Sequence, residues 1–359
     1  MVQARRLCGF LIRLCVAVIH FLRFRPFISL ASIFLLYLVS SAISSFYQLN
    51  FALAAHSLTL NDLPIDLVRA IDVSIQSKQP LRYNQSYTDN TTIPRIIHRT
   101  YKSLTIPPQW WRAYSTCVDK NPGYTQYFWT DDTAREFIKT QFPWFLHTYD
   151  SYPFAIQRVD ALRYFLLWTY GGVYLDLDIS CRRSLDPLLR PAAAFFPRTW
   201  PYGVSNDIMA STPGHPLIVK AALSLHDNAN NGKFRISKYI TVLFTTGPMF
   251  LNQILTSWFR AVKRSPALSA PSSSVAILPP IFYDRTAYAF FGHLPGSSWH
   301  GGDAKFVRWI CRHLAGLSVL GFGVMVFVAA GAWGRSRRRR VEQSRAMDVP
   351  MTYYRDTSV

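Results

Sequence analysis

The stretch AIQRVDALRYFLLWTY at residues 155–170, followed by GGVYLDLD at residues 171–178, decides the fold of this chain. The first part is predicted to be a helix that stops at the glycine pair, because glycine commonly ends helices. The apolar run after the glycines is short and rich in β-prone residues, as in a buried strand. We therefore expect a helix leading directly into a strand, with Asp176 and Asp178 at the carboxyl end of that strand.

Upstream segments repeat this alternation of strands and helices. The pattern of apolar residues, proline and glycine predicts a strand at 93–98, a helix that begins at 107–108 and ends at 121–123, a strand at 124–129 and a helix at 131–142. After residue 190 the pattern is weaker. Two helices are expected across 237–258, interrupted at Gly247-Pro248, and a strand at 275–281. This order predicts an α/β domain built on a mostly parallel sheet.

The two aspartates after the strand at 173–175 form a candidate metal site. Alternate residues of an extended chain face the same side, so Asp176 and Asp178 can converge on one ion. Hard divalent cations that bind diphosphates use one or two carboxylates and keep several waters. Open α/β sheets bind their ligands at the carboxyl ends of the strands. A solvated turn is the alternative interpretation, because an Asp-x-Asp pair also occurs by chance.

The helix at 155–170 carries two charged residues that bear on the same site. Asp160 and Arg163 lie one turn apart on one face of a helix that is otherwise mainly aromatic and aliphatic. Charged residues in such a setting are rarely left unpaired. The pair is either a structural ion pair that locks the helix to the sheet, or a functional pair in which Asp160 accepts sugar hydroxyls and Arg163 steadies a donor.

The composition limits the classes of protein that the chain can form. Of its 359 residues, 50% are hydrophobic and 15% are aromatic, which excludes a solvated disordered chain. Its five cysteines are too few and too scattered for a disulfide scaffold or a zinc module. The formal net charge is +19, with five positive charges before residue 26 and a net four after residue 334. About half of the excess charge therefore lies in two tails.

Both charged tails lie next to apolar segments. Residues 27–46 and 314–333 are each 20 residues long and carry no charge, and a membrane-spanning helix needs about 20 apolar residues. Arginines that flank a span mark its cytosolic side, so the basic tails at 1–26 and 334–359 are predicted to be cytosolic. The part between the spans is then lumenal. We expect it to consist of a stem at 47–92 and a catalytic domain at 93–313.

Two other interpretations of these segments are less consistent with the sequence than membrane spans. A cleaved signal peptide would end near residues 52–54, but the first apolar segment is longer than a usual signal sequence. A nucleic-acid-binding role for the C-terminal arginines is disfavoured, because an apolar segment of 20 residues precedes them. Two glycosylation sequons, at Asn84 and Asn90, agree with a lumenal stem. Cys117 and Cys181 lie in the lumenal part, where a disulfide is permitted, and the sequence leaves their pairing open.

Taken together, these motifs resemble glycosyltransferase family 32 at its DXD sugar-binding region. The resemblance rests on Arg158-x-Asp160-x-x-Arg163 and on GGVYLDLD, with support from residues 93–98 and 128–131. It covers about residues 93–190. Within the family the chain is most similar to the fungal inositolphosphoceramide mannosyltransferases, on account of residues 155–165, 181–188 and 296–300 and of the apolar segment at 314–333.

The resemblance implies a GT-A-like, Rossmann-type nucleotide-sugar domain with N- and C-terminal transmembrane helices. Such a domain binds its nucleotide sugar through a divalent cation, usually Mn²⁺. By motif, Asp178 would contact the metal directly and Asp176 partly through water or the ribose. Asp160 and Arg163 would hold the transferred sugar, and Tyr174 would line the same pocket.

Further roles implied by the resemblance fall at both ends of the domain. Tyr101 occupies the place of a tryptophan common in the family and is expected to stack on the base. Residues 293–300 resemble the C-terminal motif that closes such sites, with Trp299 assigned to donor binding. His293 is the first candidate for a third metal ligand and His300 the second, because neutral imidazole suits Mn²⁺; a hydrogen-bonded loop histidine is the alternative for both. Asn206-Asp207 is either a contact for sugar or acceptor, or a turn or helix cap.

The function that this resemblance implies is metal-dependent, retaining transfer of mannose from GDP-mannose to the inositol headgroup of inositolphosphoceramide, a lipid acceptor. The site would face the lumen of the Golgi, at the membrane, with a membrane subunit as a further partner and no nucleic acid. Three alternatives remain: a Golgi α-mannosyltransferase for glycoprotein glycans, a non-catalytic membrane subunit, and a dehalogenase-like phosphatase whose nucleophile is Asp176. The segment at 314–333 argues against the first, because such enzymes typically have one N-terminal anchor. Intact Asp160, Arg163, Asp176 and Asp178 argue against the second.

Overall fold

The computed structural model describes residues 47–79, 92–199, 203–230, 237–265, 268, 270–283 and 286–294, with a few isolated positions elsewhere. The chain divides into two compact units, residues 1–43 with 307–359 and residues 44–306. Apart from isolated positions, both predicted spans and both tails lie outside the described residues, as do Asn84 and Asn90. No helix in the described part of the chain combines the length and apolar character that crossing a membrane requires.

A six-stranded sheet forms the centre of the second unit. Its strands, in the order in which they lie side by side, are β2 (Thr125–Trp129), β1 (Ile96–Thr100), β3 (Gly172–Leu175), β6 (Ile208–Ser211), β5 (Ala194–Pro197) and β7 (Val275–Leu278). β1 is parallel to β2 and β3, and β5 is parallel to β7, whereas β6 is antiparallel to both of its neighbours. The sheet is therefore mixed, and the expectation of a mostly parallel sheet holds only for the β2-β1-β3 half and for the β5-β7 pair.

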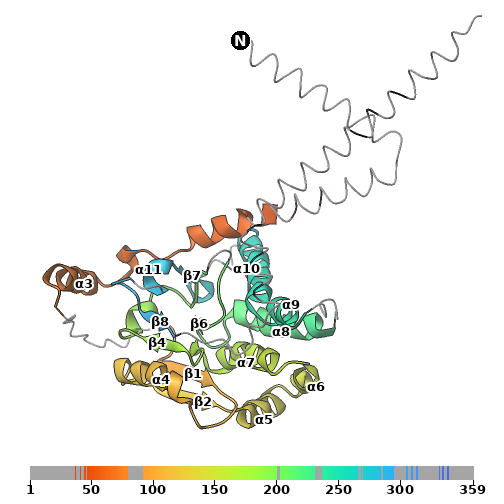
Figure 1. Cartoon of the computed structure of the whole chain (residues 1–359), viewed down its shortest axis with the longest axis horizontal. Helices are drawn as coiled ribbons and strands as arrows, with labels where there is room; N and C mark the ends of the chain where they lie inside the picture. Colours follow the sequence, from red (N-terminus) through yellow and green to blue (C-terminus); the bar gives the residue numbers. More distant parts are fainter. Residues whose placement is uncertain are drawn as a thin grey trace, which may run out of the picture. The chain divides into compact units, whose positions relative to one another are not determined.

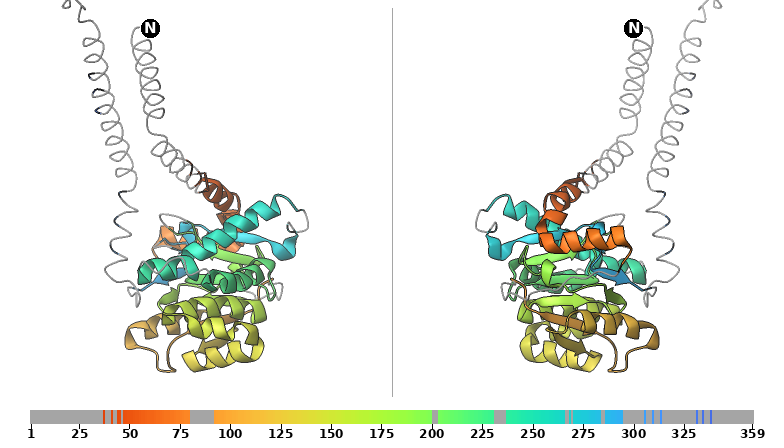
Figure 2. Two further views of the ribbon diagram at one scale, coloured as in Figure 1. Left: turned by 90° about the vertical axis from the view of Figure 1, so that its right-hand side faces the viewer. Right: turned by 90° about the vertical axis from the view of Figure 1, so that its left-hand side faces the viewer.

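Helices cover both faces of this sheet (Figures 1 and 2). One apolar core contains side chains of α5 (Asp131–Gln141), α6 (Pro143–Ser151), α7 (Ala155–Tyr170), α8 (Pro216–Asn230) and α10 (Pro248–Val262). The other contains side chains of α3 (Ile65–Ser77), α4 (Pro108–Lys120) and α11 (Pro280–Tyr283), and of the two-stranded sheet β4 (Ile179–Cys181) and β8 (Phe291–His293). Strand β3 contributes to both, because Tyr174 faces the first core and Val173 and Leu175 face the second.

The elements predicted around the DXD motif are confirmed. Helix α7 spans the predicted residues, and the chain turns into β3 through Gly171 and Gly172, both with positive φ. A Cβ on Gly172 would lie 2.7 Å from the carbonyl oxygen of Ile96 in β1, so only glycine allows the strands to approach this closely. The break between α9 (Lys238–Thr245) and α10 falls at the predicted Gly247-Pro248. β1 begins at Ile96 rather than at residue 93, and α6 was not predicted separately.

The residues just before the predicted catalytic domain belong to the same compact unit. Residues 47–55 are helical, and Leu49 and Leu53 are buried in the first core. Ser57 pairs with Ile277 of β7, and Leu67 and Ile71 of α3 lie in the second core. A short 3₁₀ helix, Leu60–Asp62, connects the two helices. The compact unit, which begins near residue 44, therefore includes described residues of the predicted stem.

A disulfide joins helix α4 to strand β4, next to the DXD motif. Cys117 at the end of α4 is bonded to Cys181 of β4, with the two Cα atoms 4.6 Å apart. The pairing that the sequence left open is therefore present in the structure. It ties α4 to the strand that follows Asp178 directly.

Candidate functional site

The site is built where β1, β2 and β3 end. These strands are parallel, so their carboxyl ends lie at one edge of the sheet, which is where open α/β sheets bind ligands. Asp176 follows β3 at this edge. Its backbone N–H donates to the carbonyl of Asp207 at 2.8 Å, and its own carbonyl accepts from Ile179 at 3.0 Å. The turn so formed leaves the side chains of Asp176 and Asp178 partly exposed.

Arg163 connects helix α7 to the motif. Its Nη2 lies 2.6 Å from Oδ1 of Asp160 and 3.5 Å from Oδ1 of Asp176, and its Nη1 donates to the carbonyl of Asn206. The guanidinium carbon lies 4.5 Å from the centre of the Tyr174 ring, in a cation–π contact. The side chain of Arg163 is 1% exposed. A buried, multiply bonded arginine of this kind fixes Asp176 relative to the helix.

Asp160 is held on both of its carboxylate oxygens. Oδ1 accepts from Arg163 and from Asn206 Nδ2, the latter at 3.2 Å, and Oδ2 accepts from the Thr246 hydroxyl at 3.1 Å. Asp160 is 4% exposed. The structure thus contains the ion pair that the sequence offered as one of two interpretations, and it places this pair against the DXD motif. Contact of Asp160 with a sugar stays a prediction.

Tyr174 lies in β3, two residues before Asp176. Its hydroxyl donates to Oδ1 of Asp176 at 2.9 Å and lies 2.9 Å from the hydroxyl of Thr100, at the end of β1. The ring itself is buried. The sequence predicts Tyr174 in the donor pocket. In the structure its hydroxyl is hydrogen-bonded to the carboxylate of Asp176. Thr100 was not predicted, since nothing in its local sequence distinguishes it.

The second carboxylate of the motif is next to His293. Strand β4 pairs with β8 so that Ile179 lies opposite His293, and Nε2 of His293 donates to Oδ2 of Asp178 at 3.2 Å. Nδ1 of His293 lies 3.7 Å from Oδ2 of Asp207, which accepts from the Tyr283 hydroxyl at 2.5 Å. His293 is thus placed beside the DXD motif. Trp299 and His300 lie outside the described residues.

Asp176 and His293 both have a raised pKa in this environment. Partial burial of the carboxylate raises the pKa of Asp176 to about 7; Arg163 opposes this shift, and the nearby carboxylates of Asp178, Asp207 and Asp160 add to it. The hydrogen bond to Asp178 raises the pKa of His293 above its ordinary value, although burial acts in the opposite direction. Both groups therefore hold their protons more tightly than usual, and a bound cation would instead favour the ionised form of Asp176.

The residues present fit a hard divalent cation that is shared with a ligand. Within the described ranges, no group of three or more His, Cys, Asp or Glu side chains is arranged to hold a metal ion by itself. Asp176 and Asp178 offer the one or two carboxylates that such cations use when diphosphate and water complete the shell. Oδ1 of Asp207 is buried beside them without a hydrogen-bond partner, and an unpaired carboxylate oxygen is favourable only near a positive charge.

Tyr101 follows β1 at the same edge. Its backbone N–H donates to the carbonyl of Trp129 at 2.9 Å, and its ring meets Trp110 edge to face, with centroids 5.8 Å apart. The structure therefore brings Tyr101, Asp160, Arg163, Asp176, Asp178 and His293 to one side of the unit. Thr246 and Tyr283 complete the arrangement from segments far away in sequence, and no sequence signal identified them.

Comparison with known proteins gives a family match over this region. Residues 107–194 match the model described as "Glycosyltransferase sugar-binding region containing DXD motif". The chain is 40% identical over 265 residues to inositol phosphoceramide mannosyltransferase 3 of Schizosaccharomyces pombe, covering 73% of this chain and 72% of that protein. It is 44% identical over 239 residues to mannosyl phosphorylinositol ceramide synthase SUR1 of Saccharomyces cerevisiae, covering 67% and 60%.

Among solved structures, the ligand-free glycosyltransferase domain of the YGT toxin aligns with a TM-score of 0.40 and 10% identity. The alignment covers 53% of this chain and 80% of that domain. This likeness is too distant for any property of the toxin to be transferred.

Proposed function

We propose that this chain, which belongs to the family of DXD-containing glycosyltransferases that includes the inositol phosphoceramide mannosyltransferases, transfers mannose to the inositol headgroup of inositol phosphoceramide. The chain is a hexosyltransferase by that membership. One observation carries the proposal: a chain 40% identical to such an enzyme holds both DXD carboxylates at the ligand-binding edge of its sheet. The domain is accordingly proposed to be GT-A-like, with a nucleotide sugar bound across this edge.

The proposed donor is GDP-mannose, bound together with a divalent cation such as Mn²⁺ at Asp176 and Asp178. When bound, the cation neutralises negative charge on the departing diphosphate. Arg163 holds Asp176 in place from the buried side, 3.5 Å away, so the carboxylate needs no reorganisation during the reaction. The hydroxyl of Tyr174 donates a hydrogen bond to the same carboxylate. Their role is to position the motif rather than to react.

We propose that transfer retains the configuration of the sugar. An inositol hydroxyl attacks the anomeric carbon on the face from which the diphosphate departs. The bond from that carbon to the diphosphate oxygen breaks, a bond to the inositol oxygen forms, and the hydroxyl proton passes to the diphosphate. Asp207, whose Oδ1 lacks a partner among the described residues, is placed to accept a hydroxyl of the sugar or acceptor.

We further propose that the catalytic unit faces the lumen of the Golgi, with a second membrane subunit as its partner. The disulfide between Cys117 and Cys181 supports this side of the membrane, because disulfides persist in oxidising compartments. The predicted spans at 27–46 and 314–333 and the arginines outside them support the same topology. A lipid acceptor suits a catalytic unit that is tethered at both ends.

Lipid analysis of cells from which the chain is deleted tests this function. We expect inositol phosphoceramide to accumulate and its mannosylated form to be lost. Re-expression of Asp178→Asn should not restore the mannosylated lipid, whereas the control Asp227→Asn, an exposed site on α8, should. Unchanged sphingolipids together with shortened glycoprotein glycans would instead favour the glycan-directed transferase.

A further inference from the structure

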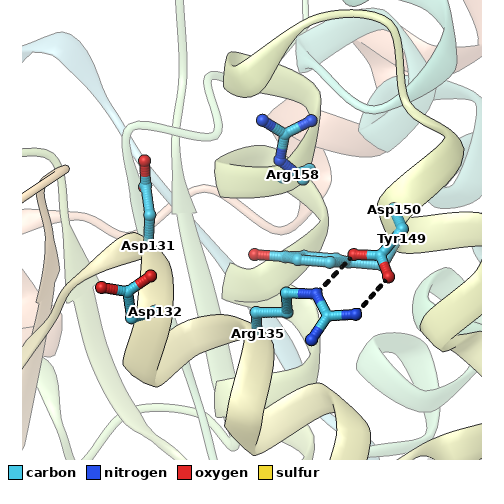
Figure 3. Close-up of a pocket in the computed structure, with 6 residues that line it drawn as sticks. All are labelled: Asp131, Asp132, Arg135, Tyr149, Asp150 and Arg158. Carbon is cyan, nitrogen blue, oxygen red and sulfur yellow. Dashed lines mark hydrogen bonds and ion pairs between the residues drawn. The ribbon is translucent and has the colours of Figure 1, made fainter.

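A pocket lies beside the candidate site, at the end of β2. It has a volume of about 360 Å³ and is lined by residues of three helices, namely Asp131, Asp132, Arg135, Tyr149, Asp150 and Arg158 (Figure 3). The first three belong to the start of α5, the next two to the end of α6 and the last to the first turn of α7. The helix termini that form the pocket therefore lie at the edge of the sheet that carries the DXD motif.

The distance from the DXD motif to this pocket suits a nucleotide. Asp131 comes two residues after the end of β2, and Asp176 directly follows β3, with β1 between the two strands. Adjacent strands are about 4.8 Å apart, so the pocket is displaced from the motif by roughly 10 Å along the edge. A diphosphate at Asp176 and Asp178 would carry its ribose across the end of β1, past Tyr101. The base would then reach the end of β2.

The polar groups of the pocket are not all satisfied by one another. Arg135 and Asp150 form a two-point ion pair, at 2.9 and 2.7 Å, that closes one wall. Arg158 donates to the carbonyl of Tyr152 but forms no ion pair with a carboxylate of the described residues. Tyr149 is 3% exposed, and its hydroxyl has no hydrogen-bond partner in the described part of the chain. In Figure 3 this hydroxyl points toward the side on which Asp131 and Asp132 lie.

We propose that this pocket binds the nucleobase of the donor and selects guanine, with Asp131 and Arg158 as the residues that read it. The assignment rests on the proposed function, because it concerns the donor of that reaction. Guanine presents N–H donors at N1 and N2, and acceptors at O6 and N7. A carboxylate accepts from the two donors together, and arginine donates to the two acceptors. Tyr149 supplies a further hydroxyl to the same base.

Asp131 is assigned to the base because it is the first residue of α5 and therefore lies nearest along the chain to the end of β2. The charges of both assigned residues also act on Tyr149: burial raises the pKa of Tyr149, Arg158 lowers it and Asp131 raises it. In Figure 3 Arg158 and Asp131 lie on different sides of the Tyr149 hydroxyl.

Uracil does not match this arrangement. Its one ring N–H lies between two carbonyl oxygens, so a carboxylate gains one hydrogen bond from uracil instead of the two that guanine offers. A base that leaves hydrogen-bonding groups of the pocket unpaired binds more weakly than one that pairs with all of them. The pocket should therefore bind a guanosine donor more tightly than a uridine donor.

Nucleotide binding to the full-length protein in detergent with Mn²⁺ tests the proposal. The probes are GDP, UDP and inosine diphosphate, which lacks only the 2-amino group of guanine. We expect Asp131→Asn to weaken GDP binding by roughly tenfold or more, the range for a two-point base contact, and to leave UDP binding unchanged. The preference of the wild type for GDP over inosine diphosphate should disappear in this variant. Arg158→Gln should weaken binding of GDP and inosine diphosphate alike.

The control is Glu136→Gln, which removes a carboxylate from the exposed surface of the same helix, where it pairs with Lys139. It should leave all three affinities unchanged. If Asp131→Asn weakens the binding of GDP and of UDP equally, or changes the binding of neither nucleotide, the base assignment is wrong even when mannose transfer is intact. If it weakens binding of myo-inositol 1-phosphate instead, the pocket serves the acceptor and the assignment is also wrong. A protein that transfers no mannose but shows the expected change in GDP selectivity would overturn only the proposed function.

Discussion

The ends of β3 and β2 differ in how their charged groups are paired. At β3, Asp160 has partners on both oxygens, and Arg163 contacts two carboxylates and a backbone carbonyl. At β2, Arg158 and the hydroxyl of Tyr149 have no side-chain partner among the described residues. The groups at the end of β3 are therefore preorganised to hold charge in place, whereas those at the end of β2 keep hydrogen-bonding groups available for a ligand. Substitutions at β3 should therefore affect stability, and those at β2 should affect binding.

The largest effect is expected from Arg163→Met. This change leaves Asp160 buried without its cationic partner, and breaking a buried pair costs about 3–5 kcal/mol. Urea unfolding should show a loss of this size, together with loss of transfer activity. Arg163→Lys should recover part of the stability, because it restores the charge but not the fork of donors. If Arg163→Met had the same free energy of unfolding as the wild type, the region at the end of β3 would not depend on this ion pair.

A smaller loss is expected from Thr246→Val, which removes the donor to Oδ2 of Asp160. A buried carboxylate oxygen that loses its hydrogen bond costs about 1–3 kcal/mol. Thr256→Val is the matched control, because its hydroxyl donates only to the carbonyl of Asn252 within one helix. Thermal unfolding of the two variants should separate them clearly. Equal midpoints would show that Thr246 does not support the β3 region.

The effect of Asp176→Asn on stability should depend on pH. A carboxyl group whose pKa is raised to about 7 in the folded state binds its proton there more tightly than in the unfolded state. Its contribution to stability is therefore present below the unfolded pKa of about 4 and is lost as pH rises toward 7. The metal-free variant, which carries no charge at this position, should have a higher midpoint than the wild type at pH 8 and a similar one at pH 4.

This prediction is checked by thermal unfolding in a chelating buffer at both pH values. The same variant should lose transfer activity at either pH, since the carboxylate is proposed to hold the cation. A difference in midpoint that is the same at pH 4 and pH 8 would show that Asp176 does not carry the raised pKa.

The smallest effect on stability is expected from Arg158→Gln. Its guanidinium contacts one backbone carbonyl and no carboxylate of the described residues, so unfolding should change by about 1 kcal/mol or less. GDP binding should nevertheless fall severalfold, as described above for the base pocket. A loss of stability as large as that of Arg163→Met would show that the β2 region is built like the β3 region, and the comparison would fail.

The part of the site that could be predicted from sequence is local. Helix α7, the glycine turn and β3 are consecutive, so the spacing of Asp160, Arg163, Asp176 and Asp178 already places them together. The placement of His293 beside Asp178 depends on the pairing of β4 with β8, which are more than 100 residues apart. A motif resemblance suggested this histidine, whereas periodicity alone gives no information about such a pairing.

Other features were not accessible because nothing local encodes them. Strand β6 is four buried residues long and antiparallel to β3, and a short apolar run does not specify its direction. Thr246 and Tyr283 act through contacts with Asp160 and Asp207 that form only when distant helices dock. The pocket at β2 likewise depends on the ends of three helices meeting. Tertiary packing, rather than sequence pattern, determines these details.

Transfer by the purified full-length chain, reconstituted in vesicles that contain inositol phosphoceramide, tests the central claim most directly. With labelled GDP-mannose and Mn²⁺, the account predicts a mannosylated inositol phospholipid from the wild type. It predicts none from Asp178→Asn, and none from the wild type supplied with UDP-galactose. Absence of lipid product from an active preparation that mannosylates a soluble glycan, or full activity of Asp178→Asn, would contradict it.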